Sequence, residues 1–546
     1  MKQVIFLFAI ALFFGFQTQK LTAQNEKSPK LVVGIVIDQM RYDYIYRYWD
    51  LYSDNGFKRL INEGFSCENH QFSYMPTYTG PGHAAIYTGT TPAINGIISN
   101  DWWDKDQKRM VYCAEDLSVA PVGTSSAMEK RSPRNLKVTT LGDQVKLGTN
   151  FKGKVIGISI KDRGAILPAG KMADQAWWFT GEDGGKFVTS DYYMKSLPAW
   201  VSEFNNSDVV KNYLKNGWNP LLPLDQYIQS NPDNSPYEGK LGNSENPVFP
   251  YDLWSMSKKG TDANIIKVTP FGNDVVADFS ILALRELNLG KDDITDLLAV
   301  SFSSPDYIGH KFGTRAVETE DNYLRLDLTI ARFLDALDKE VGKGNYLVFL
   351  TADHGAAIVP QELMDKGVNI NYFDTKGFNA FIKKAVEEKF KSDIMIENIS
   401  NYQIFLNTEA IEKGGFERED IQDFIAAQSL EFDGIYKSTS AHVLNESQFD
   451  GVLGIVQKGY NQKMSGDVLI LLAPGWLSYG HTGTSHGSPY AYDTHVPFLL
   501  YGWNIKHGST VRRTLVEDIA PTITSLIHFQ MPMGCTGNPI IEVVDK

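Results

Sequence analysis

The chain has 546 residues, which is too long for a single minimal core but allows one large domain with insertions. Its composition, 43% hydrophobic and 21% charged, is ordinary for a soluble globular protein. The net charge of −13 argues against nucleic acid as a specific partner, because nucleic-acid-binding surfaces are basic. It leaves room for a local phosphate pocket, where a bound metal ion outweighs the distant charges.

The first 23 residues are predicted to be a secretory signal peptide. Lys2 supplies a positive charge, residues 4–16 are almost entirely apolar, and Leu21-Thr22-Ala23 resembles a small-residue cleavage site. The apolar run is short for a membrane span, although an uncleaved N-terminal anchor remains an alternative. No later run is long and apolar enough to span a membrane, so we expect a soluble protein that is periplasmic or secreted.

Apolar runs alternate with helical patterns along the rest of the chain. The continuously apolar run at residues 31–37 predicts a parallel strand covered on both faces. Further strands are predicted at residues 154–160, 297–302, 346–350, 466–472 and 496–501. Helical patterns occupy residues 42–64, the segment entered at Thr79, and residues 317–341 and 517–527. This alternation predicts an α/β fold with a central, mostly parallel sheet flanked by helices.

Two segments interrupt the alternation and are predicted to be insertions in one domain of residues 24–546. Residues 177–274 are rich in Trp, Tyr, Asn, Pro and Gly with weak periodicity, and we interpret them as a cap-like cover for a site. Residues 369–457 are interpreted as a second, more compact α+β insertion.

The chain contains three cysteines, too few for a framework of disulfides. Export would permit one disulfide. Sequence proximity favours a pair between Cys67 and Cys113, which would leave Cys535 as a structural thiol.

Acidic residues and histidines follow three of the predicted strands. Asp38 ends the first strand, Asp306-Tyr-Ile-Gly-His310 follows the third, and Asp353-His354-Gly355 follows the fourth. The four-residue spacing of Asp306 and His310 puts both on one face of a helical turn, and Gly355 permits close approach of another backbone. Alone, each motif could be a helix cap with a surface histidine. Together they predict a metal-dependent enzyme, because strand ends line the ligand crevice of α/β sheets and carboxylate with imidazole suits zinc.

A further histidine ligand is expected late in the chain. The candidates are His481, His486 and His495. The segment 484–489 (TSHGSP) has the composition of a ligand-bearing loop, which favours His486.

Three short segments resemble the nucleophile region of the alkaline phosphatase superfamily, in the branch that joins nucleotide pyrophosphatase/phosphodiesterases and threonine-dependent alkaline phosphatases. They are residues 75–83 (MPTYTGPGH), 88–89 (TG) and 95–100 (NGIISN). The Asp353-His354-Gly355 and His486 segments match the same family in the same order, so the resemblance covers nearly the whole mature chain.

The resemblance implies a set of two zinc ions with Thr79 as the nucleophile. One Zn²⁺ would be held by Asp38, Thr79, Asp353 and His354, and the other by Asp306, His310 and His486. His83 and His481 match no ligand position and are expected to be structural. A threonine hydroxyl needs such activation, because it is a weak nucleophile until a metal stabilises its alkoxide.

The segment 159–168 (SIKDRGAILP) resembles PafA-type alkaline phosphatases, in which a Lys-x-Arg pair and an asparagine contact the phosphoryl group. This implies that Lys161, Arg163 and Asn100 bind substrate. A phosphate monoester is a dianion with three non-bridging oxygens, and a diester has two, so extra cations favour monoesters. The alternative is a surface Lys-Asp-Arg turn.

The implied function is an exported phosphate monoester hydrolase, an alkaline phosphatase that works through a covalent phosphothreonine. It would act as a monomer on a broad range of small phosphate monoesters and release inorganic phosphate. The alternatives are a phosphodiesterase or nucleotide pyrophosphatase on the same scaffold, and an exported metal- or phosphate-binding protein without turnover. A sulfatase is disfavoured, because no C/S-x-P-x-R motif surrounds Thr79.

Overall fold

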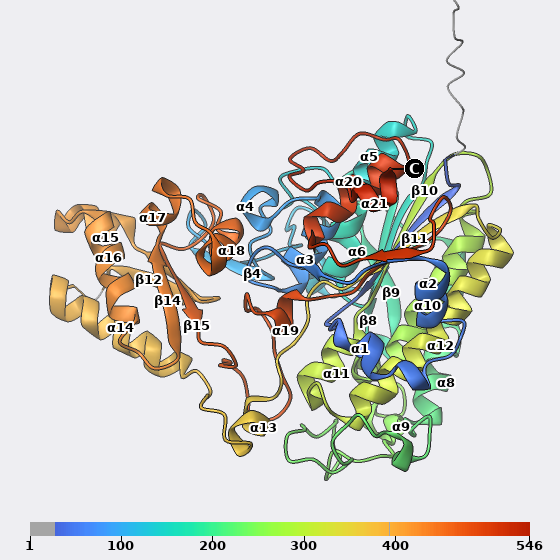
Figure 1. Cartoon of the computed structure of the whole chain (residues 1–546), viewed down its shortest axis with the longest axis horizontal. Coiled ribbons are helices and arrows are strands. Elements are labelled where there is room, and N and C mark those ends of the chain that lie inside the picture. The colour runs from blue at the N-terminus through green and yellow to red at the C-terminus, as the bar shows by residue number, and fades with distance from the viewer. Residues whose placement is uncertain (1–27, 393, 546) are drawn as a thin grey trace, which may run out of the picture.

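The computed structural model describes residues 28–392 and 394–545 (Figure 1). The predicted signal peptide, residues 1–23, lies outside this range and stays a prediction. Within the described ranges, no helix combines the length and the apolar character that crossing a membrane requires.

A ten-stranded sheet forms the centre of the larger part of the molecule, and it confirms the predicted α/β fold. Its middle, from β11 through β1, β10 and β7 to β8, is parallel, and the antiparallel strands β16 and β9 flank this part. All seven residues of β1 are buried, as expected for a strand covered on both faces. In sheet order the strands are β17 Gly508–Thr510, β2 Phe65–Cys67, β16 Phe498–Gly502, β11 Tyr346–Thr351, β1 Leu31–Ile37, β10 Asp296–Phe302, β7 Val155–Ser159, β8 Gln175–Thr180, β9 Lys186–Ser190 and β6 Pro121–Val122.

Helices cover both faces of this sheet (Figure 1). One group packs together on one face: α3 Thr79–Thr88, α5 Leu141–Gly148, α6 Asp162–Ala169 and α20 Ile519–Leu526. The other face carries α10 Phe271–Glu286 and α12 Val317–Glu340. The long helix predicted at 317–341 is therefore confirmed. The pattern at 42–64 is instead broken into α1 Asp43–Arg47, a short 3-10 turn and α2 Phe57–Glu63.

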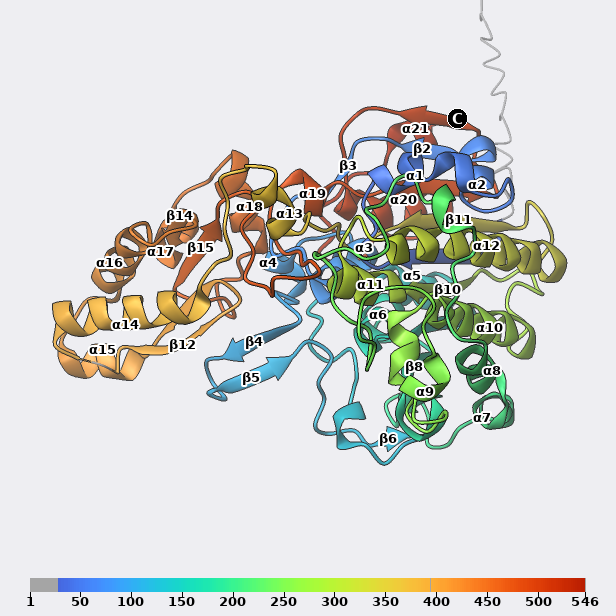
Figure 2. The ribbon, with the colours of Figure 1, turned by 90° about the horizontal axis from the view of Figure 1, so that it is seen from below.

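A second, four-stranded antiparallel sheet stands beside the main sheet (Figures 1 and 2). Its strands in order are β12 Ile396–Ser400, β13 Gln403–Leu406, β15 Val468–Leu472 and β14 Ile435–Ser440, and it shares a core with α14 Thr375–Phe390 and α16 Arg418–Ser429. The strand predicted at 466–472 exists, but its assignment to the main core is wrong. An apolar run indicates burial and does not tell which sheet the strand joins.

The segment predicted as a cap, residues 177–274, begins inside the main sheet. Strands β8 and β9 belong to that sheet, and α10 begins at Phe271. The residues between them carry α7 Ala199–Asn206, α8 Val209–Asn216 and α9 Leu253–Met256, of which α8 contacts α10. Trp218 in this segment donates its indole N–H to Asp321 Oδ2 of α12 at 2.7 Å. A role as a cap stays a prediction.

The predicted disulfide between Cys67 and Cys113 is wrong, because all three cysteines are free thiols. Cys67 belongs to the main core, whereas Cys113 belongs to a separate apolar cluster with Ala84 and Ile97. Proximity in sequence therefore does not bring these two side chains together.

Candidate active site

Four strands of the main sheet end at one edge, and each is followed there by a charged residue. Asp38 directly follows β1, Lys161 follows β7 by two residues, and Asp353 follows β11 by two residues. Asp306 lies in the first turn of α11 (Ser304–Phe312), which comes after β10. Because these strands are parallel neighbours in register, their ends lie level and bring the four side chains to one place.

Thr79 is the first residue of α3, as predicted, and its side chain is buried. The backbone N–H of Gly80 donates to Asn100 Oδ1 at 2.7 Å, which leaves Asn100 Nδ2 free to donate elsewhere. A Cβ at Gly82 would lie 2.3 Å from the carbonyl oxygen of Asp353. Glycine at this position therefore allows the start of α3 to lie directly against the Asp353 loop.

Three of the predicted ligand histidines share one hydrogen-bond pattern. Each pairs Nδ1 with a backbone carbonyl oxygen: His310 with Thr484 at 2.7 Å, His354 with Gly355 at 3.0 Å and His486 with Thr77 at 2.7 Å. A carbonyl oxygen only accepts, so Nδ1 carries the proton in each ring. The neutral ring then presents the lone pair of Nε2, which is the form that binds a metal ion.

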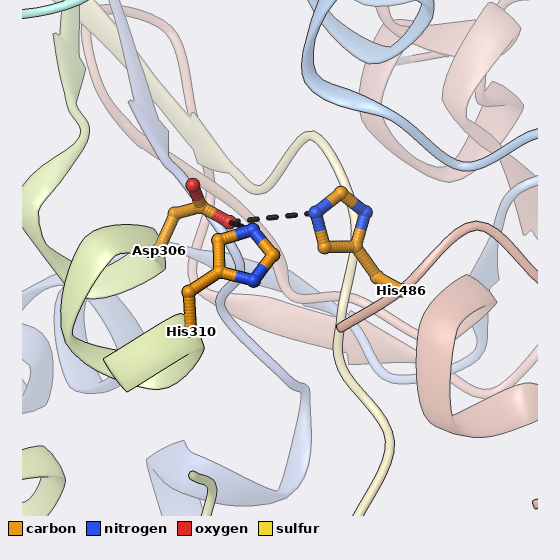
Figure 3. A group of neighbouring side chains, drawn as sticks. All are labelled: Asp306, His310 and His486. Carbon is orange, nitrogen blue, oxygen red and sulfur yellow. Dashed lines mark ion pairs between the residues drawn. The ribbon is translucent and has the colours of Figure 1, made fainter. Parts of the chain in front are cut away.

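Asp306, His310 and His486 form the first candidate metal group (Figure 3). His310 Nε2 lies 3.1 Å and His486 Nε2 lies 3.5 Å from the same oxygen, Asp306 Oδ1. Their candidate donor atoms all lie within 4.8 Å of one another. One carboxylate and two imidazoles suit zinc or a similar divalent ion.

The second candidate group contains Asp38, His354 and, again, Asp306. His354 Nε2 lies 3.5 Å from Asp38 Oδ1 and 3.6 Å from Asp353 Oδ2. Both Asp38 Oδ1 and His354 Nε2 are buried without a hydrogen-bond partner. Buried polar atoms without partners are costly, so this donor set fits a cation. The predicted ligand split gave Asp306 to one metal only, whereas its carboxylate lies within reach of both groups.

The ammonium group of Lys161 lies among these carboxylates. Nζ is 2.7 Å from Asp38 Oδ2, 2.5 Å from Asp306 Oδ2 and 3.4 Å from Thr79 Oγ1. Burial opposes the charged form, but Asp306 and Asp38 raise the pKa of Lys161 above its ordinary value. Burial, reinforced by the charge of Asp353, raises the pKa of Asp38 well above its usual range. The pocket therefore concentrates negative charge that cations must balance.

Arg163 reaches the same hydroxyl from the first turn of α6. Its Nη2 lies 3.5 Å from Thr79 Oγ1, and Nη1 donates to the hydroxyl of Tyr112 at 3.0 Å. Both predicted phosphoryl-binding cations thus meet at Thr79. Lys161 is only 4% exposed, so the alternative of a surface Lys-Asp-Arg turn is wrong.

The sequence interpretation missed Gln39, which connects Asp306 to Asp353. Its Nε2 donates to Asp306 Oδ1 at 2.7 Å, and its backbone N–H donates to Asp353 Oδ1 at 3.1 Å. Gln39 adopts a left-handed backbone, with φ of 63°. The only signal in the sequence is its position directly after Asp38, at the end of a buried strand.

His83 does not present a free nitrogen to the candidate metal groups. Its Nδ1 lies 2.9 Å from the Thr79 carbonyl oxygen and 3.3 Å from Asp353 Oδ2, and its Nε2 lies 2.9 Å from Ser301 Oγ. The ring therefore supports the start of α3, in agreement with the predicted structural role. Gly355 also behaves as predicted, since a Cβ there would lie 2.3 Å from the Tyr492 carbonyl oxygen.

Comparisons with known proteins place this arrangement in a family. Residues 32–496 match the family described as type I phosphodiesterase / nucleotide pyrophosphatase. The alkaline phosphatase PafA of Elizabethkingia meningoseptica is 44% identical over 95% of this chain and 95% of its own. The chain belongs to this family, as a PafA-type alkaline phosphatase. A relative from Myroides odoratus, 45% identical over 98% of both chains, bears the name calcium-transporting ATPase.

Solved structures of PafA agree with this assignment. Wild-type PafA superposes with a TM-score of 0.91 at 44% identity, covering 95% of this chain and 99% of that chain. A PafA variant superposes with a TM-score of 0.90 at 43% identity, covering 94% and 99%. That variant carries substitutions of a threonine, an asparagine, a lysine and an arginine. The chain is thus a phosphatase.

Proposed function

We propose that this enzyme is an exported, two-zinc phosphate monoesterase that works through a phosphothreonine at Thr79. The observation that carries the proposal is the convergence of Lys161 Nζ and Arg163 Nη2, 3.4 Å and 3.5 Å from Thr79 Oγ1. Two cations beside one buried hydroxyl match a dianionic phosphoryl group better than a monoanionic one. The substituted residue types of the PafA variant match Thr79, Asn100, Lys161 and Arg163 in order.

The proposed metal ligands draw on the two groups of side chains described above, with Asp353 and Thr79 added to Asp38 and His354. Asp38, Asp353, His354 and Thr79 would hold one zinc ion, and Asp306, His310 and His486 the other. Bound divalent ions would lower the pKa of the attacking hydroxyl and stabilise negative charge on the leaving oxygen.

The residues of the chain supply nucleophile, orientation and charge. Thr79 Oγ1 loses its proton to solvent and forms a bond to phosphorus, while the bond from phosphorus to the leaving oxygen breaks and the released alcohol takes up a proton from solvent. Asn100 Nδ2, Lys161 and Arg163 donate hydrogen bonds to the non-bridging oxygens of the transferred group. Water then cleaves the phosphothreonine ester, which releases inorganic phosphate and restores the Thr79 hydroxyl.

A phosphodiesterase is the second candidate, because the matching family is described as type I phosphodiesterase / nucleotide pyrophosphatase. The deciding experiment compares kcat/KM for an aryl phosphate monoester and the matching diester, using metal-replete protein. Thr79→Ala measured in parallel sets the background from contaminating phosphatases. We expect a clear preference for the monoester. A preference for the diester would overturn the monoesterase assignment and leave the phosphatase family membership intact.

Export and the monomeric state are part of the same proposal. Export is supported by the charged and apolar pattern of residues 1–16. N-terminal sequencing of protein recovered from outside the cytoplasm should begin near residue 24. Light scattering of the purified enzyme should give a mass close to that of one chain.

A further inference from the structure

Arg163 lies beside an open cavity of about 600 Å³, into which its long side chain could turn. Lys161, Arg163 and Tyr112 line this cavity, whereas Thr79 does not. A free arginine side chain samples many rotamers, and holding one of them costs conformational entropy. A contact that keeps the guanidinium next to Thr79 therefore matters for any reaction that depends on Arg163.

The hydroxyl of Tyr112 provides such a contact. It accepts from Arg163 Nη1 at 3.0 Å and donates to Asp162 Oδ1 at 2.5 Å, so its donor and acceptor capacities are both used. Burial raises the pKa of the Tyr112 phenol well above its ordinary value, against the opposing effect of Arg163. The group is therefore a neutral phenol that can donate to a carboxylate.

The partners of Tyr112 are themselves held in place. Asp162 Oδ2 forms an ion pair with Arg131 Nε at 2.6 Å, and Asp162 Oδ1 accepts the backbone N–H of Arg163 at 2.6 Å. The guanidinium carbon of Arg131 lies 4.4 Å from the centre of the Tyr112 ring. Aromatic ring, carboxylate and guanidinium thus restrain one another, which fixes the direction of the Tyr112 hydroxyl.

Tyr112 also shares its hairpin with the segment that positions Asn100. It is the last residue of β5 (Arg109–Tyr112), which pairs with β4 (Asp101–Asp104), and the backbone N–H of Cys113 donates to the Asn100 carbonyl at 2.9 Å. Figure 2 shows this hairpin beside the body that carries α6. One hairpin therefore contacts Asn100 through its backbone and Arg163 through the Tyr112 phenol.

We propose that Tyr112, held by Asp162 and Arg131, is a positioning residue that directs Arg163 toward the transferred phosphoryl group and thereby sets the preference for monoesters. The inference rests on the proposed function, since it takes Arg163 as a ligand of that group. Tyr112 itself does not touch the reacting atoms. Its effect passes through one hydrogen bond to Arg163 Nη1.

The test is Tyr112→Phe, which removes only the hydroxyl. We expect kcat/KM for an aryl monoester to fall about tenfold, less than the roughly hundredfold that a 1 Å misplacement of a catalytic group can cost. The value for the aryl diester should stay nearly unchanged. Asp162→Asn, which weakens the hydrogen bond that the phenol donates, should also lower the ratio of monoester to diester kcat/KM. Tyr193→Phe is the matched control, because Tyr193 packs on the same apolar cluster as Tyr112 and its hydroxyl is buried without a partner.

A double-variant cycle separates positioning from a general effect on folding. In an Arg163→Ala background, Tyr112→Phe should change kcat/KM for neither the monoester nor the diester, because the guanidinium through which Tyr112 acts is gone. The inference is overturned if Tyr112→Phe lowers kcat/KM for the monoester and the diester by the same factor. It is also overturned if Tyr112→Phe lowers monoester kcat/KM as much in the Arg163→Ala background as in the parent enzyme. If Arg163→Ala lowers kcat/KM for the monoester more than for the diester while Tyr112→Phe changes neither value, the inference fails and the proposed function stands. If Arg163→Ala itself shows no selectivity, both fail.

Discussion

The imidazole rings of His354 and His486 stack, with centroids 3.5 Å apart and an angle of 12° between their planes. The ligand assignment gives these histidines to different metal ions. Asp306 lies within reach of both groups as well. The two candidate metal sites are therefore adjacent and both lie within reach of the Asp306 carboxylate, so the occupancy of one affects the charge balance of the other.

The first prediction concerns metal removal. A chelator should strip about two divalent ions per chain, on the precedent of two-metal phosphatases, and abolish hydrolysis of an aryl phosphate. Zinc should restore the rate as occupancy returns. Elemental analysis by mass spectrometry and a rate assay on the same samples check both. Full activity in protein that contains no metal would refute the ligand assignment.

Ligand variants give a second check on the metal groups. Asp353→Asn and His486→Gln should each lower metal occupancy and turnover together, because the remaining ligands cannot complete the site. His481→Gln is the matched control. His481 packs edge-on against Tyr372, with ring centroids 4.6 Å apart, and it lies outside both candidate groups. A control that loses as much metal as the ligand variants would mean that the loss reflects general destabilisation.

The nucleophile assignment predicts different outcomes for two substitutions at Thr79. Thr79→Ala should lose nearly all turnover while its melting temperature and its binding of inorganic phosphate are retained. Thr79→Ser should keep a large part of the activity, because the hydroxyl survives. Acid quenching during turnover, followed by peptide mass spectrometry, should find phosphate on the peptide that contains Thr79. Near-normal rates for Thr79→Ala would assign the attack to water or to another residue.

Strand ends and motif order could be predicted from the sequence because each depends on local pattern. Burial of β1 on both faces appears directly as a continuous apolar run, and the residue after it is Asp38. The start of α3 at Thr79 follows from the local sequence of residues 79–86 (TGPGHAAI), which places a threonine near the N-cap of a helix. Parallel strands then carry these local features to one edge of the sheet.

What could not be predicted depends on packing between distant segments. Nothing local tells that β15 joins the second sheet, or that Cys67 and Cys113 pack into different clusters. The bridging contacts of Gln39 arise only once β1, β10 and β11 lie side by side. The sharing of Asp306 between two groups likewise depends on side-chain directions that sequence spacing does not encode.

Free cysteines predict a simple chemical result. Without reductant, unfolded protein should take up three alkyl groups from iodoacetamide, since the chain has three cysteines and all are thiols. In the folded protein at pH 8, Cys67 and Cys113 should react slowly, because burial raises the pKa of each thiol to about 12. Intact mass spectrometry reads both results. Uptake of a single alkyl group by the unfolded chain would show that two of the three cysteines form a disulfide.

Buried His70 predicts a loss of stability in mild acid. Burial, with a smaller contribution from His495, lowers the pKa of His70 from 6.5 to about 3, and Nδ1 lies 2.9 Å from Thr514 Oγ1. The unfolded chain binds the His70 proton more readily than the folded chain. The contribution of neutral His70 to folding stability is therefore fully present above pH 6.5 and is lost as pH falls toward 3. Between pH 7.5 and 5.5 the titration of His70 should lower the free energy of unfolding by about 1 kcal/mol.

Denaturant unfolding at these two pH values checks the size of the effect. His70→Asn should show a smaller difference between the two pH values than the parent protein, because the group that titrates is gone. His507→Asn is the control, since His507 is exposed. An unchanged pH difference in His70→Asn would show that other groups carry the acid sensitivity.

Substrate discrimination is the most demanding prediction, and it depends on Lys161 and Arg163. Truncating either to alanine should lower kcat/KM for a monoester more than for a diester, because only the monoester offers a third charged oxygen. Loss of one hydrogen bond to a charged group costs ~1.5–3 kcal/mol, which corresponds to roughly ten- to a hundredfold at about 1.4 kcal/mol per decade. Lys152→Ala removes an exposed positive charge elsewhere and should leave the ratio unchanged.

The double variant tests whether the two cations act on the same ligand. Lys161, Arg163 and Asn100 would share one phosphoryl group, so their effects should not add. Lys161→Ala/Arg163→Ala should therefore approach a diesterase profile without gaining much diesterase rate. Lys161 also contacts Asp38 and Asp306, so metal occupancy must be measured in the same sample. If both activities fall by one factor along with the metal content, Lys161 and Arg163 support the metal groups, and the choice between monoesterase and diesterase reopens.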